Sequence, residues 1–201
     1  MSETLSRSRA LVAERVARVP ARIAAAADSP ALPPLAAARW TVTGVGGSEG
    51  PARLLAHRLA RAGQAARFVA CSHFALPGNL DATGGLVVFS QGLSPNARGA
   101  LAVRHGFFPR VVVTAVEARA EGSDAERFLA AQLRDGTHRI PHGPAREGEL
   151  LVRLEGPAEA TVRALQLAAH ISDQPMARLR VAGLPEVPPL PAGRLALVGA
   201  G

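Results

Sequence analysis

The sequence predicts an α/β protein with a five-stranded parallel sheet, helices on both faces of the sheet, and an additional N-terminal helix. Short apolar runs alternate with amphipathic helical patterns between residues 36 and 171. The run at 86–89 is unbroken and follows glycine, which is typical of a strand buried on both faces. The runs and helices are joined by short connections, and this alternation favours parallel strands with helical crossovers.

Residues 1–34 are expected to form a helical lead-in to the main domain. Apolar residues recur at helical spacing from Leu5 to Ile23 among charged residues. Pro20 is expected to break or kink this helix, which then resumes to residue 27. The helix would cover the sheet or a partner subunit, and simple core packing is favoured over a role in interaction.

A glycine-rich loop follows the first predicted strand, at 39–43. It reads Gly44-Val45-Gly46-Gly47-Ser48 and precedes a predicted helix at 51–62. Glycines at 46 and 47 let the backbone approach a ligand closely, and Ser48 lies at the helix entrance. The loop is therefore the first candidate binding segment.

Two nucleotide-binding interpretations of this loop fail. A dinucleotide fold requires Gly-x-Gly-x-x-Gly, but Glu49 stands in place of the third glycine, and no acidic residue ends the second predicted strand, at 67–71. A nucleoside-triphosphate loop requires Gly-Lys-Ser or Gly-Lys-Thr, and the chain contains no lysine.

A second loop, Ser90-Gln91-Gly92-Leu93-Ser94, follows the strand at 86–89. Ser94 is suited to cap the next helix, expected over 96–105, with Pro95 at its first position. A buried strand, a hydroxyl-rich turn and a helix N-terminus together favour an anion, because free N–H groups and the helix dipole face it. An ordinary capped turn is an alternative of about equal weight. A serine-bearing loop follows each of two predicted strands. Together, the two loops suggest a site that holds one compact phosphate from both sides.

The second half of the chain completes the predicted sheet. A fourth strand is expected at 110–113 and a fifth at 150–154. Helices are expected at 123–133, where Ser123 and Glu126 form a capping box, and at 159–171. The polar segment 134–149 between them is interpreted as a lid over the ligand or as a surface insertion.

Glu155 is the one candidate catalytic residue. At the end of the predicted fifth strand it could act as a general base. A charge placed near a helix N-terminus explains it equally well.

Composition excludes several other classes of function. The 23 basic residues are all arginine and give a formal charge of +7, but they are scattered and few aromatics accompany them, so no nucleic-acid partner is expected. Cys71 with His73, and His138 with His142, lack the further ligands of a metal site, so no metal or cofactor is expected. A single cysteine favours a reducing, cytoplasmic compartment, and no segment approaches the length of a membrane span.

The order strand–GVGGS–helix, strand–SQGLSP–helix resembles the sugar isomerase (SIS) phosphosugar-binding domain, a flavodoxin-like or Rossmann-like three-layer fold. The likeness is to the first such domain in the isomerase half of glucosamine-6-phosphate synthase, and it covers about residues 35–172. It implies that Ser48, Ser90 and Gln91 match the family's phosphate loops. Gly92 and Leu93 replace a Ser-Gly pair, and Ser94 would restore the lost hydroxyl. A third match, 155–161, resembles the family's Glu-x-Gly-Val-Ala-Ser-Thr, with Glu159-Ala160 in place of the Ala-Ser that touches the sugar.

The resemblance also implies the domain division: an SIS-like domain over 35–183, then a Pro-rich linker and strand over 184–201 that resemble the start of a second SIS domain. In the synthase, the catalytic glutamate and the ring-opening histidine lie in that second domain. We therefore expect a domain that binds a sugar phosphate and is inactive by itself. The alternatives are an aldose–ketose isomerase or amino-sugar-phosphate deaminase using Glu155 or a neighbouring subunit's histidine, and a phosphosugar-sensing regulatory module. A lone domain would leave helix faces uncovered, so a homodimer is expected.

Overall fold

The computed structural model describes residues 3–28, 32–75, 83–103, 106–144 and 153–174. The α-helices are α1 (Glu3–Ala27), α2 (Glu49–Arg61), α3 (Pro95–Ala102), α4 (Asp124–Arg134) and α5 (Glu155–Ile171), and two short 3-10 helices are η1 (Gly46–Ser48) and η2 (Cys71–Ala75). The strands are β1 (Arg39–Gly44), β2 (Ala65–Phe68), β3 (Gly84–Phe89), β4 (Phe107–Thr114) and β5 (Thr137–Pro141).

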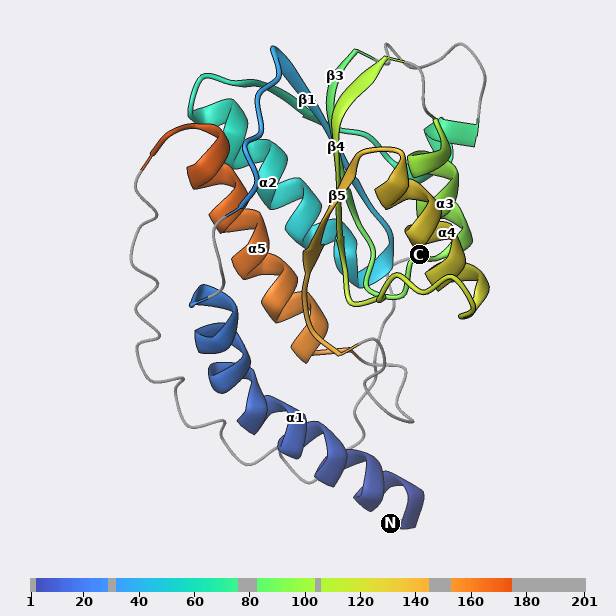
Figure 1. Ribbon diagram of the computed structural model, residues 1–201. Coiled ribbons are helices and arrows are strands. Elements are labelled where there is room, and N and C mark those ends of the chain that lie inside the picture. Colours follow the sequence, from blue (N-terminus) through green and yellow to red (C-terminus); the bar gives the residue numbers. More distant parts are fainter. Residues whose placement is uncertain (1–2, 29–31, 76–82, 104–105, 145–152, 175–201) are drawn as a thin grey trace.

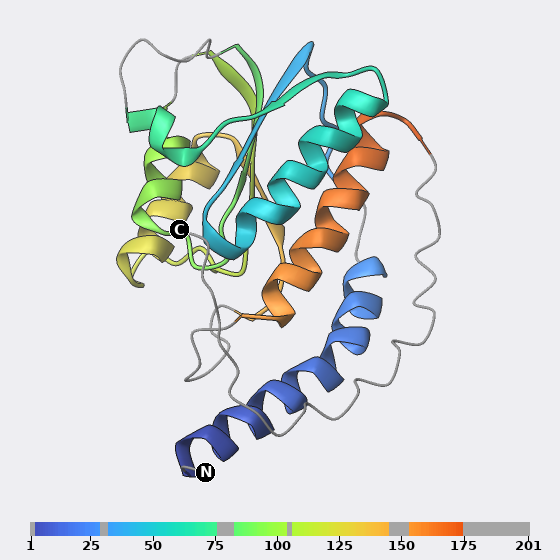
Figure 2. The same cartoon turned by 180° about the vertical axis from the view of Figure 1, so that it is seen from behind.

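The predicted fold class is confirmed. The five strands form one sheet in the order β2-β1-β3-β4-β5, and every neighbouring pair is parallel. Helices α2 and α5 cover one face and α3 and α4 the other, so the domain has three layers (Figure 1). Helix α1 lies outside α5 and extends beyond the sheet, as the view from behind also shows (Figure 2).

The central strand β3 explains why the run at 86–89 has no polar residue. Leu86 and Val88 face the layer of α3 and α4, and Val87 and Phe89 face α2 and α5. All four side chains are fully buried. Successive strand residues point to opposite faces, so a strand covered on both sides needs apolar residues throughout. Burying each such side chain contributes about 1.5–3 kcal/mol before the entropic cost of folding.

The fifth strand lies at Thr137–Pro141, not at 150–154. It pairs with β4 at the edge of the sheet, within the segment that the sequence suggested was a lid or an insertion. Strand β5 was hidden because an edge strand tolerates polar residues and a terminal proline, here His138, Arg139 and Pro141. Of the expected strand, 150–152 lie outside the described residues, and Arg153 and Leu154 precede α5 without pairing in the sheet.

Other boundaries differ by a few residues. Strand β2 ends at Phe68, so Cys71 begins η2 instead of ending a strand. Helix α3 ends at Ala102, and 104–105 lie outside the described residues, as does the whole of 184–201.

The N-terminal helix continues through Pro20, although Figures 1 and 2 show that it bends along its length. Its end is fastened to α5. Arg163 donates to the carbonyl of Ala26 at 3.1 Å, and Gln166 donates to the same oxygen at 2.9 Å. The last carbonyls of a helix have no partner within it, so these two side chains supply the missing donors. None of the described helices is both long and apolar enough to cross a membrane.

Candidate functional site

The two serine-bearing loops lie side by side because their strands are neighbours. Strands β1 and β3 pair in parallel, with Gly44 opposite Phe89 at their carboxyl ends. Residues 45–48 and 90–94 therefore leave the sheet at the same edge, where ligands bind in open α/β sheets.

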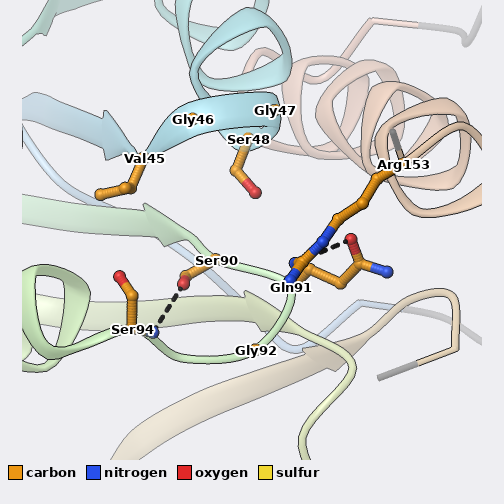
Figure 3. A pocket seen from close by; sticks show the side chains of 9 residues that line it. All are labelled: Val45, Gly46, Gly47, Ser48, Ser90, Gln91, Gly92, Ser94 and Arg153. Atoms are coloured by element: carbon orange, nitrogen blue, oxygen red, sulfur yellow. Dashed lines mark hydrogen bonds between the residues drawn. The ribbon is translucent and has the colours of Figure 1, made fainter. Parts of the chain in front are cut away.

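The first loop turns sharply and directs Ser48 toward the second. A Cβ at Gly44 would lie 2.4 Å from the carbonyl oxygen of Ser48, so only glycine permits this turn. Gly46 adopts a positive φ of 57°, which also favours glycine. Ser48 stands at the start of α2 without making a side-chain capping bond. Its hydroxyl points toward the second loop (Figure 3).

The second loop is held by its own serines. The backbone N–H of Ser94 donates to Oγ of Ser90 at 3.1 Å, and that of Ala97 donates to Oγ of Ser94 at 3.4 Å. The predicted cap at Ser94, with Pro95 at the first helical position, is confirmed. Because each Oγ acts here as an acceptor, each hydroxyl proton can still be donated to an anion.

Leu93 occupies the left-handed region, with φ of 49°, at a place where the resembled family has glycine. A leucine pays a conformational cost there. Its side chain is 1% exposed and packs in the cluster that contains Leu101 and Leu129, which explains how the loop tolerates it.

Gln91 connects the second loop to the rest of the domain. Its Nε2 donates to the carbonyl of Pro144 at 2.6 Å, and its own carbonyl accepts from the N–H of Ala115 and from Oγ1 of Thr114, each at 3.1 Å. Its carboxamide packs against the first turn of α5, at Gly156. The side chain and backbone of this residue are thus held from three directions.

The two loops border an open cavity of about 500 Å³. All six predicted binding residues line it: Gly46, Gly47, Ser48, Ser90, Gln91 and Ser94. Val45, Gly92 and Arg153 complete the lining (Figure 3). Arg153 was not predicted from the sequence, because residues 150–154 were expected to form a fifth strand.

Two of the three helices that begin next to the cavity, α2 and α5, start with the same three residues, Glu-Gly-Pro. Pro157 approaches the first loop, where a Cβ at Gly47 would lie 3.3 Å from its Cγ. Helix α5 therefore touches both loops, one through Pro157 and the other through Gly156.

Glu155 is not among the residues that line the cavity. It is 3% exposed, and its carboxylate accepts from Nε of Arg22 at 2.9 Å, with Nε of Arg18 at 3.5 Å. Both arginines belong to α1. The structure thus places this carboxylate at the start of α5 and pairs it with the N-terminal helix.

Glu159 and Cys71 also have partners within the protein. Glu159, which aligns with a sugar-contacting residue of the resembled family, accepts from the N–H of Gly143, and its carboxylate lies 3.7 Å from Nε of Arg22. Cys71 is buried, with its Sγ 3.1 Å from Oγ1 of Thr43. Burial raises the pKa of this thiol, which outweighs the hydrogen bond with Thr43.

No protein-family model matches the sequence, and no curated protein matches it either. Solved structures do share the fold. The E. coli CFT073 protein c3406, solved in complex with a sugar phosphate, has a TM-score of 0.55 at 18% identity, and the match covers 86% of this chain and 93% of that one. A Bacteroides fragilis NCTC 9343 protein, whose name assigns it as a phosphosugar isomerase involved in capsule formation, has a TM-score of 0.52 at 15% identity, with 81% and 90% covered.

The third comparison is with the C-terminal domain of glucosamine-fructose-6-phosphate aminotransferase from Francisella tularensis. Its TM-score is 0.56 at 10% identity, and the match covers 80% of this chain and 48% of that one. The chain spans less than half the length of several matching structures. These likenesses confirm the expected resemblance at the level of the fold: the chain has the fold of SIS domains.

Proposed function

We propose that this chain binds a sugar phosphate in the cavity between the loops 45–48 and 90–94. The observation that carries the proposal is the convergence of three serines, Ser48, Ser90 and Ser94, on one cavity at the N-termini of α2 and α3. Hydroxyl donors and N–H groups at helix N-termini favour a phosphate, and a cavity of about 500 Å³ is large enough for a sugar phosphate.

The comparisons support this proposal without naming the ligand. The E. coli c3406 structure, which matches most of this chain, was solved with a sugar phosphate bound. For the present chain we propose the same class of ligand.

We further propose a binding domain, in preference to an isomerase or deaminase. The carboxylate that would act as a base, Glu155, is paired with Arg22 and lies outside the cavity lining. Incubating the purified chain with fructose 6-phosphate and following aldose formation tests the enzymatic alternative. Turnover that is lost in Glu155→Gln would favour the isomerase.

Calorimetry of the purified chain tests the binding site directly. Glucose 6-phosphate and fructose 6-phosphate are expected to bind, and glucose to bind poorly. Each charge-assisted hydrogen bond to phosphate contributes roughly 1.5–3 kcal/mol, so Ser90→Ala is expected to weaken binding by about tenfold or more. Ser72→Ala is the matched control, because Ser72 is exposed in η2 and does not line the cavity. Equal affinity for glucose and its phosphate, or no effect of Ser90→Ala, would overturn the proposal.

We also propose that the chain acts in the cytoplasm as a homodimer, since an isolated domain of this fold leaves helix faces uncovered. Light scattering at high micromolar concentration is expected to give twice the mass of one chain. A monomer under those conditions would contradict the dimer and leave the binding site unaffected.

A further inference from the structure

Serine hydroxyls and backbone N–H groups recognise the shape of a phosphate but carry no net charge. A phosphate ester has a charge of about −1.5 to −2 at neutral pH. A site made only of neutral donors would distinguish weakly between this group and a sulfate ester, which has similar oxygens and a single negative charge. A cation in the cavity would strengthen the selection for phosphate, because it interacts more strongly with the more highly charged ester.

Arg153 is the ionisable residue among the nine that line the described cavity. Its guanidinium extends toward the turn formed by Ser90 and Gln91 (Figure 3). The contact that holds it there is long: Nη1 lies 3.4 Å from Oε1 of Gln91. A guanidinium carries five N–H donors, so most of its donor capacity remains for a ligand.

The charge of Arg153 is also uncompensated within the described part of the chain. Some other arginines there pair with carboxylates, such as Arg22 with Glu155 and Arg53 with Glu49. No ion pair between described residues includes Arg153. Among the described residues, therefore, no carboxylate neutralises this positive charge, and the guanidinium extends toward the cavity.

Gln91 and the start of α5 place this guanidinium beside the cavity. Gln91 presents Oε1 toward it while Nε2 donates to the carbonyl of Pro144. Arg153 itself lies two residues before α5, whose first turn packs against both loops. The segment that carries Arg153 is thus followed at once by a helical turn that packs against both loops of the cavity.

We propose that Arg153 selects the charge of the ligand, so that the cavity takes dianionic phosphate monoesters in preference to sulfate esters and neutral sugars. This inference rests on the proposed function and adds a ligand class to it. Arg153 donates to a phosphoryl oxygen from the side of the cavity opposite Ser94, and the serines supply the remaining donors.

Glucose 6-phosphate and glucose 6-sulfate, titrated at pH 7.5 and fixed salt concentration, provide the test. The wild-type chain is expected to prefer the phosphate by about tenfold or more. Arg153→Gln is expected to weaken phosphate binding by about tenfold and sulfate binding by much less, which brings the ratio near one. Arg153→Lys keeps the positive charge but loses the planar guanidinium that can bind two oxygens at once, so it should retain part of the preference for phosphate.

Arg58→Gln is the matched control. It removes the same charge from an exposed position in the last turn of α2, outside the cavity lining, and should leave the ratio unchanged. If Arg153→Gln weakens both esters by the same factor, or neither, the inference is wrong even while Ser90→Ala still reduces binding. If Ser90→Ala also has no effect, the proposed function fails with it. Thermal unfolding of each variant separates a loss of binding from a loss of folding.

Discussion

The carboxamide of Gln91 lies directly against the backbone of Gly156, so that a Cβ at Gly156 would be 2.4 Å from Cδ of Gln91. These residues are far apart in sequence, one in the loop after β3 and the other in the first turn of α5. Their contact brings the start of α5, with Arg153 just before it, to the edge of the cavity. The shape of the candidate site therefore depends on a glycine that does not itself line it.

Gly156→Ala is expected to weaken sugar-phosphate binding, because the new methyl group must displace the Gln91 side chain. Gly50→Ala is its matched control: Gly50 also follows the first glutamate of a helix that begins Glu-Gly-Pro, but a Cβ there meets nothing within 4 Å. That control should bind normally and gain up to about 1 kcal/mol of stability from the better helix propensity of alanine. Calorimetry and urea denaturation measure the two effects. Equal binding by the two variants would show that Gln91 can move without consequence.

Ser94→Ala is expected to lower both stability and ligand affinity. Ser94 caps α3 and lines the cavity, so the substitution removes a cap worth about 1 kcal/mol and also a donor to the ligand. Ser123→Ala removes the equivalent cap from α4, away from the cavity, and should lower stability alone. Denaturation paired with calorimetry distinguishes the variants, and unchanged affinity in Ser94→Ala would remove that serine from the site.

Glu155→Gln is expected to reduce the free energy of unfolding by about 1–3 kcal/mol, since it replaces a buried carboxylate that accepts from Arg22. The loss is smaller than for a fully buried pair, because the Arg22 side chain is partly exposed and can turn to solvent. Glu14→Gln breaks an exposed pair with Arg18 and should cost less than about 0.5 kcal/mol. Urea denaturation of both variants measures the difference. If they lose equal stability, Glu155 does not fasten α1 to α5.

Cys71 gives this chain a simple alkaline titration, because the sequence has neither lysine nor tyrosine. Burial raises the pKa of the Cys71 thiol, so in the unfolded chain, where it is about 8.5, the thiol ionises first. Above that pH the unfolded state binds fewer protons than the folded one, and stability falls as pH rises. Urea denaturation at pH 8–10.5 should show this fall, and Cys71→Ala should flatten it. An equally steep fall in Cys71→Ala would place its origin elsewhere.

The sequence by itself determined the features that depend on near neighbours along the chain. The caps at Ser94 and Ser123 bond to N–H groups three residues away, so residue type and spacing were enough to find them. The apolar run at 86–89, preceded by glycine and rich in valine and phenylalanine, identified the central strand, because a strand covered on both faces requires apolar residues throughout. The same logic placed the serine loops at the ends of neighbouring parallel strands, and all six predicted residues line one cavity.

Tertiary structure alone decided the features that join distant segments. Strand β5 is held by its pairing with β4 at the sheet edge, where the polar residues at 138–139 left no alternating pattern to read. Glu155 meets Arg22 across 133 positions of sequence, and Arg153 meets Gln91 across 62. Local sequence propensity cannot predict such contacts, because the two residues of each pair become neighbours only when the layers of the fold pack together. The start of α5 is therefore where sequence reasoning was least informative, and packing there brought a cation into the cavity that the serine loops form.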